Sequence, residues 1–221
     1  MLSPLNIHAV RTLFNVVHQL GNVLGTSWTS VVTTLYTLDG ILLRSATNKD
    51  LRTPELGTES DLEILETSLN HLFASTSNLC AEAVVCLLSS LRDVSLQSLT
   101  SPKSKHARPS FCLQRMVDVL LKNLDRVHDL WGVFLAHVIE VIGTNEPSSW
   151  AIAIDGLDRA VVGILDECLR GGTAADSGAI ENMLLVALES LFSDTNHRQI
   201  RLGILRISLH VLQRSGESLT R

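Results

Sequence analysis

The stretch VRTLFNVVHQLGNVLGTSWTS at residues 10–30 holds the pattern that decides the fold. An apolar segment with helical spacing ends at a short turn, and a tryptophan follows near the start of the next apolar segment. The same order returns in LQRMVDVLLKNLDRVHDLWGVF at residues 113–134. A helical hairpin that recurs along a chain is typical of a stacked solenoid, whose units pack on their neighbours. The repetition therefore predicts a fold that builds surfaces rather than one central active site.

Apolar side chains recur with the period of an α-helix along most of the chain. Three segments, beginning at Cys80, Leu113 and Ile180, carry apolar residues at steps of 0, 3, 4, 7, 8 and 11. A stripe this wide can be buried against two neighbouring helices at once, and no strand-like alternation extends beyond a few residues. We therefore predict an all-α protein, an α-solenoid of HEAT- or armadillo-like helical hairpins with about nine helices.

Glycine, proline and small polar residues divide the chain into these helices. Thr26 or Ser27 is expected to cap the second helix, and Ser60 the third. We expect residues 1–221 to be a single helical-repeat segment of a longer protein. Its hairpins are expected at about 5–44, 60–98 and 110–142, followed by single helices at about 148–170, 178–192 and 196–214.

Composition narrows the classes of function. The formal net charge of −5 is mild and spread along the chain, which gives no electrostatic reason to expect nucleic acid as a ligand. No apolar run reaches the length that spans a bilayer, and we expect a cytoplasmic protein. The four cysteines follow no metal-like spacing, so we expect buried free thiols at Cys80, Cys86, Cys112 and Cys168.

Residue patterns that would carry chemistry are missing from the sequence. Asp125, His128 and Asp129 lie together at a helix junction, where capping and exposed charge fit better than catalysis. No nucleophile elbow occurs, and the glycines at 21, 25, 171 and 172 form no phosphate-binding loop. Trp28 and Trp131 are expected to pack between the layers of hairpins. We predict no catalytic, cofactor-binding or metal-binding residues and no cofactor.

Two clusters of charge leave alternatives open. The basic segment with Lys103, Lys105 and Arg108 could contact anionic lipid or a phosphorylated partner, or could be a solvated loop without a ligand. The cluster near the last turn is equally ambiguous; it consists of Asp194, His197, Arg198 and Arg201.

Several stretches resemble the central helical-repeat region of the Mon-two family. The most specific are LFNVVH at 13–18 with GNVLGTSW at 21–28, and KNLDRVHDLW at 122–131. The likeness continues through Glu140-Val-Ile, Trp150 and residues 153–164 to Ser215–Leu219, and it is weaker over 65–96. Residues 148–151 depart from it, since the family has charged residues before this tryptophan and a glycine after it.

The resemblance implies a trafficking scaffold at the Golgi, the trans-Golgi network and endosomes. Members of that family are related to the BIG and GBF exchange factors for Arf GTPases but lack the Sec-seven catalytic domain. The implied partners are Dopey-type proteins, Arf-like GTPases and, indirectly, a lipid flippase, with peripheral membrane association through the full-length assembly.

The favoured function is therefore a non-catalytic scaffold segment in Golgi-to-endosome vesicle trafficking, and the protein is not expected to be an enzyme. The alternative is a guanine-nucleotide exchange factor or regulator for an Arf-family GTPase. Exchange by the related enzymes uses a loop of the Phe-Arg-Leu-Pro-Gly-Glu type, and none of the five prolines here precedes a Gly-Glu pair. A HEAT-type regulatory subunit of a kinase or phosphatase fits the fold but not the family-like residues.

Overall fold

The computed structural model describes residues 4–47, 59–100, 109–144, 146–171 and 174–219. All regular structure within these residues is helical, which confirms the predicted all-α class. Short 3-10 turns lead into α2, α4 and α6. The α-helices of the described residues are α1 (Pro4–Leu20), α2 (Trp28–Thr47), α3 (Glu59–Ala74), α4 (Ala81–Thr100), α5 (Pro109–Lys122), α6 (Val127–Ile142), α7 (Pro147–Gly171), α8 (Ala174–Asp194) and α9 (Arg198–Leu219).

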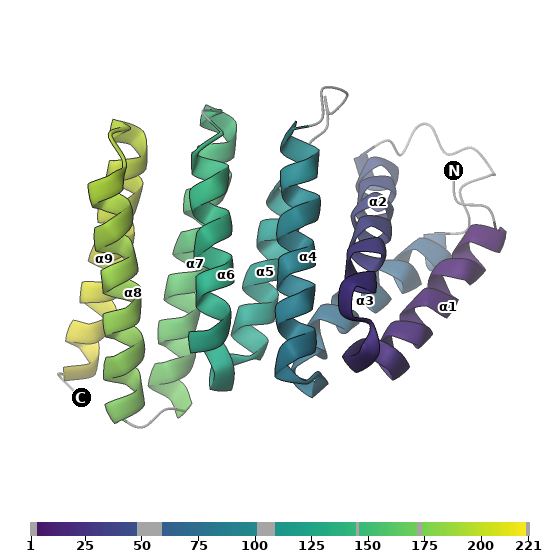
Figure 1. Ribbon diagram of the computed structural model, residues 1–221, viewed down its shortest axis with the longest axis horizontal. Helices are drawn as coiled ribbons and strands as arrows, with labels where there is room; N and C mark the ends of the chain where they lie inside the picture. The colour runs from purple at the N-terminus through teal and green to yellow at the C-terminus, as the bar shows by residue number, and fades with distance from the viewer. Residues whose placement is uncertain (1–3, 48–58, 101–108, 145, 172–173, 220–221) are drawn as a thin grey trace.

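The helices form two layers, because each one packs on the helices two places before and after it in the chain. One layer holds α1, α3, α5, α7 and α9, and the other holds α2, α4, α6 and α8. Successive helices such as α4 and α5, or α6 and α7, join the two layers. The array is elongated, and the chain begins at one end of it and finishes at the other (Figure 1). This arrangement is the α-solenoid that the repeated hairpins predict.

The buried core follows the predicted apolar stripes. In α4, Ala83, Val84, Leu87, Leu88 and Leu91 are all buried. The stripes of α5 and α8 are likewise buried over most of their length, and the buried residues form one continuous cluster through both layers. Removal of this apolar surface from water is the main favourable term in folding, so the stripes account for the order in which the helices stack.

The two predicted tryptophans are core residues. Trp28 begins α2 and is fully buried, and its indole Nε1 donates a hydrogen bond to the carbonyl oxygen of Gly21 at 3.2 Å. A Cβ on Gly21 would lie 2.7 Å from Leu79 Cδ2, so the missing side chain lets the turn after α3 close over the indole. Trp131 is buried in α6, and its ring centroid lies 5.5 Å from that of Phe134.

Hydrogen bonds join the turns of successive hairpins along one edge of the array. The side-chain Oδ1 of Asn22 accepts from the backbone N–H of Cys80 at 2.8 Å. On the other side of the same turn, Arg126 Nη1 donates to the carbonyl oxygen of Leu79 at 2.9 Å. The turn between α3 and α4 is therefore held by the turns before and after it, which fixes the register of three hairpins.

Some helix ends differ from the prediction. Ser60 lies inside α3 instead of capping it, and Thr26 and Ser27 form a 3-10 turn instead of capping α2. α8 begins at Ala174 rather than at 178, and α9 continues to Leu219 rather than to 214. Glycine near a helix end favours termination, but a single glycine costs a helix only about 1 kcal/mol and tertiary packing can outweigh it.

The last helix exposes an apolar face. Leu202, Leu205, Leu209 and Leu212 recur at helical spacing and are each between 52% and 60% exposed. On the opposite side, α9 packs on α7 and α8. The outer leucines have no described neighbour to bury them, because α9 is the end of the described array.

Replacement of Trp28 by alanine is expected to lower the free energy of unfolding by about 3–5 kcal/mol, because it leaves a large cavity and an unpaired carbonyl at Gly21. Trp131→Ala should cost a similar amount. Denaturant titration followed by circular dichroism measures both. Leu209→Ala, at an exposed position of α9, is the control and should change stability by less than about 0.5 kcal/mol. A midpoint for Trp28→Ala equal to that of the parent would contradict the packing described above.

Candidate interaction surface

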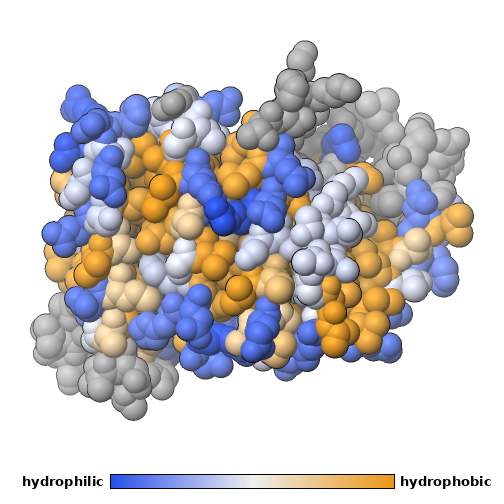
Figure 2. All heavy atoms as spheres, viewed as in Figure 1, coloured by the Kyte–Doolittle hydropathy of each residue, from blue (hydrophilic) through white to orange (hydrophobic). Residues whose placement is uncertain are grey.

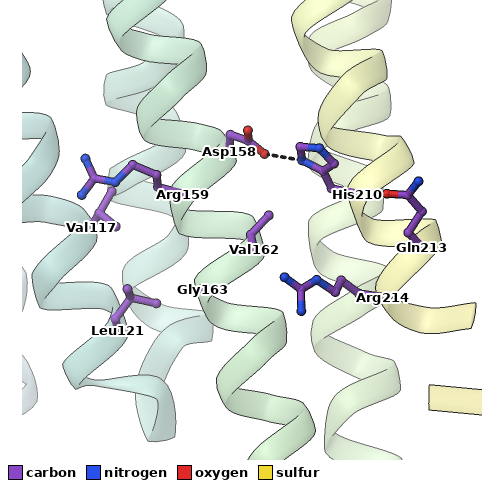
Figure 3. Close-up of a pocket in the computed structure, with 9 residues that line it drawn as sticks. All are labelled: Val117, Leu121, Asp158, Arg159, Val162, Gly163, His210, Gln213 and Arg214. Carbon is purple, nitrogen blue, oxygen red and sulfur yellow. Dashed lines mark hydrogen bonds and ion pairs between the residues drawn. The ribbon is translucent and has the colours of Figure 1, made fainter. Parts of the chain in front are cut away.

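A groove of about 520 Å³ lies over α7, between α5 and α9 (Figure 3). It opens on the layer of odd-numbered helices. Figure 2 shows the opposite face, where apolar residues are distributed among polar ones. Three helices line the groove, with Val117 and Leu121 from α5, Asp158, Arg159, Val162 and Gly163 from α7, and His210, Gln213 and Arg214 from α9.

Helical spacing places these side chains together. Val117 and Leu121 are four residues apart, so they lie one above the other on α5. His210, Gln213 and Arg214 follow the same rule on α9, and the side chains of His210 and Arg214 project toward α7 in Figure 3. The groove therefore has an apolar side against α5 and a polar side against α9.

A hydrogen bond and two ion pairs tie α7 to α9 at the polar side of the groove. Asp158 Oδ1 lies 2.9 Å from His210 Nδ1, and Asp158 Oδ2 lies 3.5 Å from Arg206 Nη2. A second pair joins Arg214 Nη1 to Asp166 Oδ1 at 2.9 Å. These groups are partly exposed, and such pairs contribute at most about 1 kcal/mol each to stability. Their main effect is to orient the side chains at the rim of the groove, and Arg206 supplies the positive charge beside the carboxylate of Asp158.

Two glycines set the spacing of the three helices. A Cβ on Gly163 would lie 2.8 Å from Leu121 Cδ2, so the bare backbone of α7 lets the Leu121 side chain rest against it. A Cβ on Gly203 would lie 2.7 Å from Ile154 Cγ2, so α9 can approach α7 in the same way. The floor of the groove is therefore formed by close contact of helix backbones and leucine or isoleucine side chains.

A polar cluster, partly exposed at the surface, joins α4 to α6 in the other layer. Arg92 Nε donates to Glu140 Oε2 at 2.7 Å, and Arg92 Nη2 also contacts Glu140 Oε1. This hydrogen-bonded guanidinium lowers the pKa of Glu140. His137 is fully buried beside the pair, with Nδ1 3.8 Å from Glu140 Oε2. Neither ring nitrogen of His137 has a hydrogen-bond partner within the described part of the chain.

Burial lowers the pKa of His137 to about 4, because desolvation disfavours the charged imidazolium. The negative charge of Glu140 opposes this shift, and the positive charge of Arg92 adds to it. His137 is therefore neutral at pH 7. This cluster is a structural feature of the α4–α6 interface, where the buried His137 lies beside the partly exposed Arg92–Glu140 pair.

The cysteine prediction is only half correct. Cys112 and Cys168 are buried, whereas Cys80 and Cys86 are half-buried. Cys80 lies just before α4 and not on its apolar face, because the helix begins at Ala81. Among the described residues, no group of three or more histidine, cysteine, aspartate or glutamate side chains could hold a metal ion. None of the described helices has both the length and the apolar character needed to cross a bilayer.

The charged residues singled out in the sequence do not form one site. Asp125 pairs with Arg126 at 3.5 Å, while His128 and Asp129 are exposed in the first turn of α6. The basic segment with Lys103, Lys105 and Arg108 lies outside the described residues, as does Gly172.

Near the last turn, two of the four predicted residues make aromatic contacts. The guanidinium of Arg201 lies 4.2 Å from the ring centroid of Phe192. The ring of His197 packs against Trp150 in a tilted arrangement, with 4.5 Å between the ring centroids. Asp194 Oδ2 accepts a hydrogen bond from Ser190 Oγ at 3.3 Å. These contacts give the cluster a packing role where α9 begins.

The groove and the His137 cluster were not predicted from the sequence. Each depends on residues that lie about 50 positions apart and come together only through the stacking of alternate helices. A weak signal was present for both, because Asp158, Arg159 and Asp166 interrupt the apolar pattern of α7, and His137 and Glu140 interrupt that of α6.

Comparison with known proteins gives whole-chain similarity to one family. No protein-family model matches the chain. It is 30% identical to a MON2 homolog of Xenopus laevis and 29% identical to the human MON2 homolog, in alignments that each cover 99% of this chain. The resemblance to the Mon-two family is confirmed. The chain spans only 13% of the length of each of these two Mon2 homologs.

Part of the chain is also similar to exchange factors. The Saccharomyces cerevisiae ADP-ribosylation factor guanine nucleotide-exchange factor SEC7 is 32% identical over 116 residues, which is 49% of this chain and 6% of SEC7. The Mon2 homologs match over about twice that share of the chain. Together these relatives indicate a trafficking-related helical scaffold.

The buried His137 predicts that stability falls in mild acid. Its pKa is about 4 in the folded protein and 6.5 without the fold, so the unfolded chain binds a proton first as the pH drops below 6.5. The free energy of unfolding should therefore decrease by about 2 kcal/mol between about pH 7.5 and pH 5 from this group alone. Glu140 stays ionised over that range, because its pKa is lowered.

Denaturant titrations at the two pH values measure this loss, and His137→Leu should reduce it by about 2 kcal/mol. His128→Gln, which changes an exposed imidazole in the same helix, is the matched control and should leave the loss as in the parent. An equal loss in the His137→Leu variant and the parent would show that the imidazole is not desolvated in the folded state.

Proposed function

We propose that this chain is a non-catalytic scaffold segment in Golgi-to-endosome vesicle trafficking that acts through protein–protein contacts. The observation that carries the proposal is the similarity to Mon2 homologs along 99% of the chain. The fold supports it, because a two-layer helical array offers extended ridges and grooves to a partner. In this proposal the chain is one part of a longer helical-repeat protein, and the bare leucine face of α9 is a surface on which further helices can pack.

Family resemblance suggests the partners. Dopey-type proteins and Arf-like GTPases are the proposed direct partners, and a lipid flippase would be reached through the former. The proposed location is the cytoplasmic surface of Golgi, trans-Golgi network and endosome membranes. Attachment would be peripheral and would come from the full-length assembly. The basic segment with Lys103, Lys105 and Arg108 is a candidate for a lipid contact within it.

A second candidate function is guanine-nucleotide exchange on an Arf-family GTPase, or its regulation. The partial similarity to SEC7 favours it. Against exchange itself, the sequence contains no loop of the type that carries the glutamate finger of the related enzymes. An acidic finger is needed to displace the magnesium ion and phosphates of the bound nucleotide, so we prefer the scaffold.

Two assays separate these functions. The chain is expected to bind a full-length Dopey-type protein in co-purification, and it should leave the release of a fluorescent nucleotide from Arf and Arf-like GTPases at the spontaneous rate. A Sec-seven catalytic domain serves as the positive control for release. Catalysed release would favour the exchange-factor function, and failure to co-purify with the Dopey-type protein would contradict the proposed partner.

A further inference from the structure

One cation in the groove between α5, α7 and α9 is not neutralised. Arg159 is exposed on α7, and within the described residues its guanidinium makes no ion pair or hydrogen bond. The other arginine in the groove, Arg214, is held by Asp166, and the carboxylate of Asp158 is already satisfied by His210 and Arg206. The groove therefore presents an available positive charge, although the chain as a whole has a net charge of −5.

Apolar surface lies next to this charge. In Figure 3 the side chain of Arg159 extends toward Val117, while Leu121 and Val162 lie further along the groove. Val117 is buried, so the accessible apolar surface comes from Leu121 and Val162, over which apolar side chains at positions i and i+4 of a second helix could lie. A space of about 520 Å³ admits a few side chains, but not a folded domain.

We propose that this groove binds an amphipathic helix of a partner protein whose apolar side chains, one turn apart, are flanked by carboxylates. Its apolar residues fill the space over Leu121 and Val162, and a glutamate or aspartate pairs with Arg159. This is the helix-in-groove mode of recognition, in which apolar anchors supply affinity and charge selects the partner. The proposal rests on the proposed scaffold function and names the class of segment that the scaffold recognises.

A protein helix fits the groove better than an anionic membrane does. Recruitment to a lipid surface uses clusters of several lysines and arginines that face the bilayer together. Here only Arg159 is free of a carboxylate partner among the lining residues, and the adjoining floor is apolar. The guanidinium of Arg159 beside the apolar floor of the groove is complementary to a partner helix that carries a carboxylate beside an apolar side chain.

Peptide display tests the proposal on the 221-residue chain. A phage library of random peptides about 16 residues long, enough for four helical turns, is selected on the immobilised protein. We expect enrichment of sequences with leucine or isoleucine one turn apart and glutamate or aspartate beside them. A synthetic peptide from this set should bind about tenfold more weakly to Arg159→Glu, and substitution of its glutamates by lysine should restore binding to that variant.

Arg198→Glu is the matched control. It makes the same change of charge at an exposed arginine of α9, 12 positions before His210 and so about 18 Å from the groove along the helix. Its affinity should stay within about twofold of the parent. Circular dichroism of both variants confirms that the helices are intact. The proposal is overturned if no acidic amphipathic sequence is enriched, if Arg159→Glu binds as the parent does, or if the groove substitution weakens binding to phosphatidylserine vesicles instead of peptides.

Co-purification with a full-length Dopey-type protein distinguishes failure of the proposed scaffold function from failure of the proposed groove. If the parent and Arg159→Glu both retain that protein, the scaffold function stands and the groove is not its binding site. If neither does, the proposed partner fails whatever the peptides show. Retention by the parent and Arg198→Glu, with loss in Arg159→Glu, supports both.

Discussion

Every inner helix of the array must bury apolar side chains against more than one neighbour at the same time, and the rest of the structure depends on this requirement. The helical steps of 3, 4, 7 and 8 make a stripe wide enough to meet it, as in α4, where the stripe from Ala83 to Leu91 is buried. Alternate helices can then stack into two layers. The polar side chains beside each stripe stay at the surface, where they line grooves and form ion pairs.

The buried polar groups refine this arrangement rather than drive it. Asn123 donates to Thr76 Oγ1 at 3.0 Å between the turns of two hairpins, and Arg92 bridges α4 to Glu140 of α6. Asn123 and Thr76 are buried and would be costly to leave unpaired, so a shift in helix register is penalised more strongly than it would be by apolar packing alone. Glycines contribute by the absence of a side chain. Gly163 and Gly203 let α5, α7 and α9 approach closely enough to form a continuous surface.

The sequence was informative about what is local and repeated. The apolar stripes, the all-α class and the burial of Trp28 and Trp131 follow from spacing within single helices. Helix ends were less predictable, because α8 begins at Ala174 rather than at 178 and α9 continues to Leu219 rather than to 214. The groove lay beyond sequence reasoning, since Val117, Arg159 and Arg214 meet only through the stacking of three helices. The family resemblance pointed to the biological setting but to no particular surface.

Because each described helix makes its main contacts with helices near it in the chain, substitutions at one end of the array have mainly local effects. The main helix–helix contacts join helices no more than three places apart in the chain, so α1 to α3 and the groove on α7 and α9 are linked only through intermediate layers. Folding cooperativity in such an array is graded with distance, as in a one-dimensional chain of coupled units. A destabilising substitution near Trp28 would therefore loosen the helices at that end of the array, and its effect on stability would be weaker at Arg159 near the other end. Natural variation can therefore remodel one end of the solenoid while the recognition properties of the other are conserved.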